Sequence, residues 1–261
     1  MIKNYLNVII PIIKICQNWH VVILCKIFNL KIKEIQLRNG IRFDINSIIP
    51  KAELSMLVET WFNHDYTPIG FEINEKDLVI DIGANSGFFS IFAAKKALKG
   101  TVVSFEPVPE LVSKIKRNIY LNNISNIKLE QIGISNKEGH SEFYVSKTHN
   151  GCHSLFKRDN SDSKIIIKTM KLEDYCFKNN IQKINLLKID CEGAEYTIFN
   201  SLSTAFLKNN IEKIAMEYHD VINNNKHEEI VNLLTSNGFS TKVLGDFNSG
   251  YIYAINNNLI K

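Results

Sequence analysis

The sequence predicts an α/β domain built on a mostly parallel β-sheet. Short apolar runs alternate along the chain with segments of helical pattern, as expected for parallel strands joined by crossover helices. The clearest unit is an apolar strand at 77–80, a glycine-rich turn at 81–87 and a helix at 88–97. This order of strand, glycine turn and helix builds the nucleotide-type binding sites of doubly wound folds.

The length and composition of the chain fit one medium-sized domain with an extension. The chain has 261 residues, of which 45% are hydrophobic, so a full core is available and global disorder is excluded. We expect an N-terminal basic helical and hairpin extension at 1–50 and the main domain at 51–261. The five cysteines are odd in number and form no C-x-x-C pair, which argues against a disulfide framework or a zinc site and favours the reducing cytoplasm.

The N-terminus is apolar and basic. Its longest uncharged run, 15–25, is shorter than the roughly 20 residues that a membrane helix needs, and no signal-peptide cleavage site follows it. We expect short amphipathic helices docked on the domain, because Pro11 and the segment 18–20 would break one long helix. Residues 1–42 hold seven Lys and Arg against Glu34 alone, a net +6, so the other 219 residues of this +4 chain carry −2. An exposed basic face explains this simply; peripheral contact with the inner face of a membrane is the alternative.

The elements follow in order. Alternating residues around Asn39-Gly40 predict a hairpin over 35–45 with a type I′ turn, and 53–62 is expected to be helical. Further strands are expected at 78–80, 101–105, 127–132, 141–145, 164–169, 184–189, 211–217, 243–244 and 251–255. Further helices are expected at 109–122, just before 199 and at 228–237. Residues 147–163 are expected to form a polar loop.

Acids follow four of the predicted strands. They are Asp81, Glu106, the pair Asp190 and Glu192, and Glu217, which is followed by His219. Since the carboxyl ends of parallel strands meet at one edge of the sheet, where ligands bind, these side chains are expected to converge in a cleft.

The glycine turn favours a particular cofactor. An acid at the strand end, Asp81, suits a cationic ligand such as S-adenosylmethionine better than a pyrophosphate. Gly83 and Gly87 are separated by three residues, so neither G-x-G-x-x-G nor a P-loop is present. Glu106 lies nineteen residues after Gly87 and is expected to accept the ribose hydroxyls.

Four segments together resemble the FkbM family of S-adenosylmethionine-dependent methyltransferases. They are D-I-G-A-N-S-G at 81–87, F-E-P at 105–107, L-K-I-D-C-E-G-A-E at 187–195 and E-Y-H at 217–219, and the similarity spans roughly 50–255. The glycine turn indicates only a class I methyltransferase, whereas the last two segments are the specific ones. Cys191 stands where the family usually has a β-branched residue.

The resemblance implies a Rossmann-like class I methyltransferase fold whose seven-stranded sheet has one antiparallel edge strand. It also implies an S-adenosylmethionine-dependent O-methyltransferase acting on a hydroxyl of a saccharide or related metabolite. The matched cofactor-binding positions are Asp81, Gly83, Ala84, Asn85, Gly87, Glu106 and Asp190. The matched acidic and late motifs are Lys188, Asp190, Glu192, Glu195, Glu217 and His219.

The catalytic hypotheses concern the acceptor proton. An alcohol must lose its proton, so Asp190, Glu192 or His219 would act as base, with His219 best suited by its ordinary pKa and Glu217 placed to orient it. Lys188 would instead lower the pKa of the acceptor hydroxyl. Asp190, Glu192, Glu217 and His219 also suit a magnesium or manganese ion, but acids around a cationic cofactor give the same pattern, so no metal is expected.

Other residues and functions stay open. Ser154 with His153 would line the acceptor pocket, and Tyr66 or Trp61 would stack on a ligand, although a solvated loop and core packing explain them equally well. The alternatives to O-methylation are N- or carboxyl-methylation of a small molecule and an inactive binding module of the same fold. A nicotinamide-dependent reductase is disfavoured by the glycine spacing. Nucleic acid is not expected as a partner, because the domain body is net −2 and carries no aromatic-basic stripe.

Overall fold

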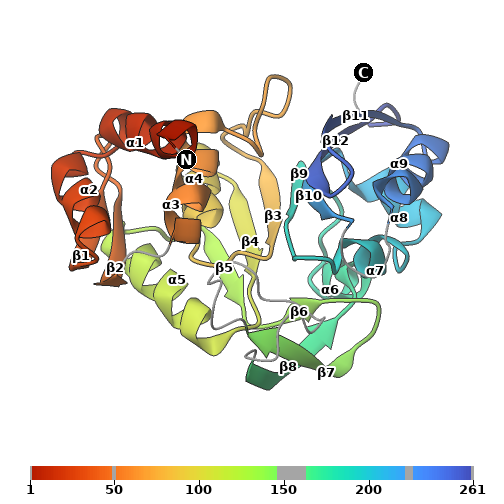
Figure 1. The fold of residues 1–261 in the computed structure, drawn as a ribbon. Helices are drawn as coiled ribbons and strands as arrows, with labels where there is room; N and C mark the ends of the chain where they lie inside the picture. Colours follow the sequence, from red (N-terminus) through yellow and green to blue (C-terminus); the bar gives the residue numbers. More distant parts are fainter. Residues whose placement is uncertain (1, 49–50, 146–162, 221–225, 260–261) are drawn as a thin grey trace.

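The computed structural model describes residues 2–48, 51–145, 163–220 and 226–259, and its centre is a seven-stranded sheet (Figure 1). The strands lie in the order β11-β12-β10-β9-β3-β4-β5. Their bounds are β3 Leu78–Ile82, β4 Thr101–Phe105, β5 Ile127–Glu130, β9 Leu186–Ile189, β10 Lys213–His219, β11 Phe239–Gly245 and β12 Ser249–Asn256. The predicted mostly parallel seven-stranded sheet is therefore confirmed.

The antiparallel strand is not at the edge. β12 pairs antiparallel with both β10 and β11, so it lies one place inside the sheet and β11 forms the edge. A hairpin connects β11 to β12 and returns the chain against the free side of β10. The expected edge position was wrong because the order in which strands pair is a tertiary property.

Helices cover both faces of the sheet. Their bounds are α4 Phe88–Lys96, α5 Pro109–Leu121, α6 Leu172–Lys178, α7 Glu195–Phe199, α8 Thr204–Asn210 and α9 His227–Ser236. Alternate residues of β3 enter different cores: Ile80 and Ile82 pack with residues of α6–α9, whereas Val79 packs with residues of α4. Because both faces are buried, the central strands are almost continuously apolar. The short helices α6 and α8 were not predicted.

A second, three-stranded sheet adjoins the main one. It consists of β6 Gly133–Ile134, β7 Gly139–Val145 and β8 Ser163–Met170 in the order β6-β8-β7. The strands predicted at 141–145 and 164–169 are confirmed, and β6 is additional. Nearly all of the predicted loop at 147–163, with His153 and Ser154, lies outside the described residues.

The extension contains the two expected short helices, α1 Ile2–Ile15 and α2 Trp19–Ile27, followed by β1 Lys31–Gln36 and β2 Arg42–Ile48. Pro11 lies within α1 and does not end it. The break falls at Cys16–Asn18, where the Asn18 side chain exchanges hydrogen bonds of 3.0 Å each with the backbone of Glu34 and Gln36 in β1. No helix among the described residues is long and apolar enough to cross a membrane.

The predicted hairpin forms with a different turn. Gly40 has φ +86°, but Asn39 does not share the left-handed conformation that a type I′ turn requires at both central residues. The Gly40 N–H donates to the Leu37 carbonyl at 3.0 Å, and the Leu37 N–H donates to the Ile41 carbonyl at 2.7 Å. These bonds define a three-residue loop with glycine in the left-handed position, the next most common solution for a hairpin.

The extension shares a core with the main domain. Phe43 of β2 packs with Leu57 of α3 (Lys51–Val58) and with Phe88 of α4. On α5, the Asn118 and Asn122 side chains accept the N–H groups of Asp44 and Arg42 at 2.7 and 2.8 Å. A domain boundary at residue 50 remains a prediction, since the packing is continuous across it.

Candidate active site

A cavity of about 210 Å³ lies at the carboxyl edge of the sheet, where the sequence placed the cleft. The strand ends contribute Gly83, Asn85, Glu106, Asp190, Glu192 and Glu217 to its lining. The opposite walls come from α3 and the π-helical turn η1 (Glu59–Asn63), and from the three-stranded sheet through Phe143, Ile167 and Thr169. Three of the four predicted acidic strand ends therefore meet in one cavity, through Glu106, Asp190, Glu192 and Glu217, whereas Asp81 does not reach it.

The glycine turn is held tightly between two strands. The N–H groups of Gly83 and Ala84 donate to the Phe105 carbonyl at 3.1 and 3.0 Å. Gly83 has φ +79°, and a Cβ atom there would lie 1.8 Å from the Asp190 backbone oxygen, so only glycine fits. These two amides are bonded inside the protein, so the turn is held in one conformation by β4.

Glu106 faces the cavity from the end of β4. Its carboxylate accepts the Asn85 N–H at 2.8 Å and the Val108 N–H at 3.0 Å, which fixes its orientation. Burial raises the pKa of Glu106 to about 7, although these two hydrogen bonds act to lower it. Each oxygen keeps acceptor capacity for a further donor such as a hydroxyl.

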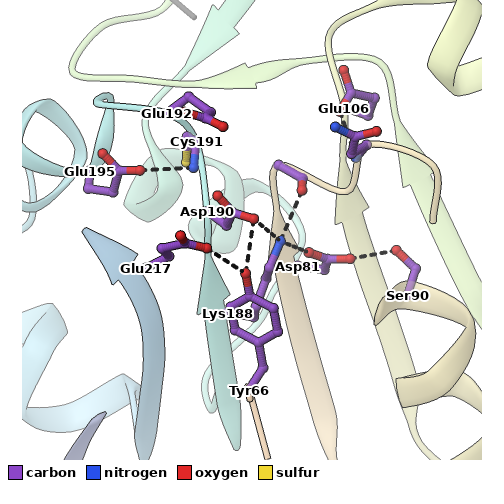
Figure 2. A network of polar contacts seen from close by, with 12 residues as sticks. Tyr66, Asp81, Ser90, Glu106, Lys188, Asp190, Cys191, Glu192, Glu195 and Glu217 are labelled. Atoms are coloured by element: carbon purple, nitrogen blue, oxygen red, sulfur yellow. Dashed lines mark hydrogen bonds and ion pairs between the residues drawn. The ribbon is translucent and has the colours of Figure 1, made fainter. Parts of the chain in front are cut away.

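Asp81 and Lys188 lie under the glycine turn. The Lys188 Nζ is 3.1 Å from Asp81 Oδ1 and donates to the Gly83 carbonyl at 2.9 Å, while the Ser90 hydroxyl donates to the other Asp81 oxygen at 2.6 Å (Figure 2). Neither residue lines the large cavity. The geometry places both side chains behind the turn and suits a positioning role, so the predicted cofactor contact of Asp81 and the predicted catalytic role of Lys188 stay predictions.

The Lys188 ammonium stays charged in this setting. Burial opposes the charge, but the carboxylates of Asp81 and Asp190 overcome it and raise the pKa of Lys188 above its ordinary value. The distance from its Nζ to Asp190 Oδ2 is 3.8 Å. The Lys188 ammonium, fixed behind the glycine turn, therefore neutralises part of the negative charge of the carboxylates at this edge of the sheet.

Tyr66 joins two acids of the cavity wall. Its hydroxyl lies 3.0 Å from Asp190 Oδ2 and 3.2 Å from Glu217 Oε2, and its single proton serves one of them at a time (Figure 2). Burial, together with the charge of Asp190, raises the pKa of Glu217 to about 8. The stacking role proposed for Tyr66 is not what the structure shows, because the ring is buried and only its hydroxyl group reaches the acids.

Glu59 is a site residue that the sequence did not indicate. It lines the cavity from η1, and burial, with the charges of Asp190 and Asp65, raises its pKa to about 7. Single π-helical turns are frequent at functional sites. Glu59 follows no strand, so the rule that located the other acids could not find it. Phe143 and Ile167 were missed because they are apolar and lie within strands, whereas the rule selected polar residues at strand ends.

The turn after β9 is shaped by Glu195. This fully buried carboxylate accepts the Cys191 N–H at 3.0 Å and the Gly193 N–H at 2.7 Å, and Glu192 between them has φ +55°. The turn places Glu192 in the cavity lining. Glu195 therefore organises the acidic motif from behind.

His219 is enclosed by carboxylates. Its Nδ1 lies 3.1 Å from Glu195 Oε1, and its Nε2 lies 3.5 Å from Glu192 Oε2 and 3.7 Å from Glu217 Oε1. Burial opposes its charge, but the hydrogen bond and charge of Glu195, with the charges of Glu192 and Asp190, raise the pKa of His219 to about 10. An imidazolium has no lone pair to accept a proton, so the geometry argues against the predicted base role and favours positioning of the acids.

The remaining predicted residues lie close by. Gly87 begins α4 with φ +81°, and Ala84 lines a small neighbouring void with Tyr66 and Lys188, so neither reaches the large cavity. Trp61 is a core residue, in edge contact with Phe43 and Phe92. The side-chain ligand atoms of Asp190, Glu192 and His219 lie within 4.8 Å of one another, as the metal alternative required. His219 and Glu192 already pair with each other, and Asp190 pairs with Tyr66 and Lys188. The expectation of no metal remains a prediction.

A family model described as the methyltransferase FkbM domain matches residues 81–241, which contain every strand end of the cavity. The chain belongs to the FkbM methyltransferase family. The resemblance seen in the glycine turn and the acidic motifs is confirmed, and with it the assignment of this FkbM methyltransferase as an enzyme of methyl transfer.

Named relatives of this FkbM methyltransferase are distant. It is 26% identical over 147 residues to Methyltransferase 1 of Beauveria bassiana, covering 49% of this chain but only 59% of that protein. It is 26% identical over 211 residues to the 31-O-demethyl-FK506 methyltransferase FkbM of Streptomyces tacrolimicus, covering 70% and 80%. It is 25% identical over 173 residues to the hexuronic acid methyltransferase AglP of Haloferax volcanii, covering 66% and 67%.

The donor chemistry of the cavity fits S-adenosylmethionine, the methyl donor of this fold. Glu106 offers acceptors for ribose hydroxyls, and the acids of β9 and β10 suit the cationic amino and sulfonium groups. Phe143, Ile167 and neighbouring apolar side chains provide a surface for a base. Gly83, Asn85, Glu106 and Asp190 of this FkbM methyltransferase would hold the cofactor.

Proposed function

We propose that this enzyme transfers a methyl group from S-adenosylmethionine to a hydroxyl oxygen of a saccharide or related small metabolite. One observation carries the proposal: Glu217, with a pKa raised to about 8, lines the same cavity as the ribose-type acid Glu106. A carboxylate whose pKa lies near neutrality is a stronger base than an ordinary one and suits proton removal from an alcohol.

Residues of the cavity wall can remove the proton of the acceptor hydroxyl. Bound S-adenosylmethionine supplies an activated methyl group. Glu217 accepts the acceptor's hydroxyl proton at a carboxylate oxygen, and the Tyr66 hydroxyl, 3.2 Å from Glu217 Oε2, holds that carboxyl group in place. Glu59 shares the wall and a similarly raised pKa, so it is the second candidate for the base. Positioning of the reactants supplies much of the remaining acceleration.

The acceptor class rests on charge and on the relatives. Glu59, Asp190, Glu192 and Glu217 make one wall acidic, which disfavours methylation of a carboxylate because like charges would be brought together. The relatives' names describe action on 31-O-demethyl-FK506 and on a hexuronic acid. The first name supports an oxygen atom as the acceptor, and the second supports a sugar-derived acceptor but leaves open whether its hydroxyl or its carboxylate is methylated. A cationic amine is the alternative that the acidic wall would also attract.

The test compares acceptors and two site variants. Neutral sugars, uronic acids and amino sugars are incubated with S-adenosylmethionine, and methylated products are located by mass spectrometry. E217Q is expected to lower kcat by about 100-fold or more, the usual share of a general base, with little change in S-adenosylhomocysteine affinity. E106A is expected to lose cofactor binding in calorimetry. The exposed acid Glu229 provides the control, and E229Q should behave as wild type.

Two results would overturn the proposal. Full activity of E217Q on a hydroxyl acceptor would remove Glu217 from the base role. Methylation confined to amines or carboxylates would replace O-methylation by one of the other reactions.

A further inference from the structure

The outer face of α2 is apolar where a helix on a protein surface is normally polar. Val22 and Cys25 face the core, and the opposite side carries Leu24, Ile27 and Phe28, which are 51%, 64% and 65% exposed. Their spacing of three and four residues places them on one stripe. The polar residues of α2 are His20 and Lys26, so its remaining exposed surface is largely apolar, and a contiguous apolar surface commonly marks an interaction site.

Further exposed apolar side chains lie on α1, on α2 and just after α2. Trp19 and Val21 in α2, Leu30 just after it, and Ile10 and Ile13 in α1 are all at least one-third exposed. α1 and α2 contact each other and form one end of the molecule, far from α6–α9 (Figure 1). We call the exposed residues Ile10, Ile13, Trp19, Val21, Leu24, Ile27, Phe28 and Leu30 the apolar end.

Positive charge borders the apolar end. The Leu30 N–H donates to the Cys25 carbonyl at 2.8 Å, which turns the chain directly from α2 into β1. Lys31 and Lys33 of β1 are exposed, on either side of the buried Ile32, and directly follow Leu30 in the chain. The first 33 residues contain five lysines and neither aspartate nor glutamate.

We propose that the apolar end docks on an anionic membrane surface, with its apolar residues in the headgroup region and Lys31 and Lys33 on the lipid phosphates. Interfacial helices combine Trp, Phe and Leu on one side with lysines at the border, and each lysine near an anionic surface adds to binding. A second copy of this chain fits the same face less well. A twofold interface would bring both copies' lysines together, and such juxtaposed like charges oppose association.

The test uses the full chain and vesicle flotation. Phosphatidylcholine vesicles with and without phosphatidylglycerol are compared at low and high salt. Wild type is expected to float with the anionic vesicles and to be released by salt. K31E/K33E should lower the partition coefficient roughly tenfold or more, since each lysine contributes severalfold. L24E/F28E should abolish flotation even at low salt.

Matched control variants test whether loss of flotation is specific to the apolar end or follows from any added negative charge on the surface. F177E changes an apolar residue that is 85% exposed on α6, and K116E/K242E changes two exposed lysines on other elements. Both should float as wild type does. Circular dichroism and S-adenosylhomocysteine calorimetry verify that every variant is folded and binds cofactor, so a failure here is distinct from a failure of the methyltransferase site.

Three outcomes would overturn the proposal. The first is wild-type protein that floats with no vesicle. The second is flotation of both K31E/K33E and L24E/F28E with anionic vesicles to the same extent as wild type. The third is a wild-type dimer in light scattering that L24E/F28E converts to monomer, which would make a second copy of the chain the partner.

Discussion

Substitution of Lys188 by methionine tests how the glycine turn is supported. Methionine keeps the length of the side chain but removes the ammonium group that contacts Asp81 at 3.1 Å and the Gly83 carbonyl at 2.9 Å. The Lys188 and Asp81 side chains are only 4% and 0% exposed, so solvent cannot replace the lost partner. Asp81 would retain the Ser90 hydroxyl alone as a hydrogen-bond donor.

The expected loss is large. Removing one partner of a buried ion pair typically costs about 3–5 kcal/mol, a large part of the roughly 5–15 kcal/mol that stabilises a domain. Urea unfolding followed by circular dichroism measures the free energy of unfolding. The double variant D81N/K188M should be more stable than K188M, because no uncompensated carboxylate remains buried.

An exposed ion pair provides the control. Lys99 lies 3.0 Å from Glu75, with side chains 64% and 49% exposed, so K99M should cost at most about 1 kcal/mol. If K188M lost no more stability than K99M, or if D81N/K188M were less stable than K188M, the proposed support of the turn would be refuted.

Two further predictions concern the glycine turn and the histidine. G83A should lose S-adenosylhomocysteine binding and have a melting temperature well below that of G70A. Both glycines have left-handed φ values, but only at Gly83 would a Cβ atom meet backbone, 1.8 Å away. Equal melting temperatures of the two variants would contradict this. His219 binds its proton more tightly in the folded protein, where its pKa is about 10, than at its ordinary value of 6.5. Its contribution to stability is therefore complete below about pH 6.5 and is lost as pH rises toward 10. The gap in unfolding free energy between wild type and H219Q should narrow over that range, and a constant gap would show that His219 is not held as an imidazolium.

The strands and their ends were predictable because their signals are local. The strand predicted at 101–105 has the bounds of β4, and the predicted helix at 109–122 differs from α5 by one residue. Burial on both faces makes the central strands continuous apolar runs, and the polar residue after each run marks its carboxyl end. The positions of Glu106 and Asp190 follow from that pattern together with the edge rule for parallel sheets.

The missed features depend on contacts between distant segments. Glu59 reaches the cavity because α3 and η1, at the start of the main domain, form one of its walls, and no strand pattern precedes Glu59. Of the two predicted breaks in the N-terminal helix, the one beside Asn18 is confirmed, where Asn18 bonds to β1, whereas Pro11 lies within α1 and does not end it. The hairpin turn was assigned from Asn-Gly alone, but the chain closed with one more residue in the loop.

The sequence by itself determined the fold class, the family and the edge of the sheet at which the site lies, because hydrophobic periodicity, glycine spacing and family motifs are properties of short, continuous segments. Only the tertiary structure decided where each side chain lies and what surrounds it. Asp81 and Lys188 proved to lie behind the turn, and His219 proved to be surrounded by Glu192, Glu195 and Glu217. Protonation and access depend on burial and on charges brought together from separate strands, and neither can be read from the order of residues along one strand.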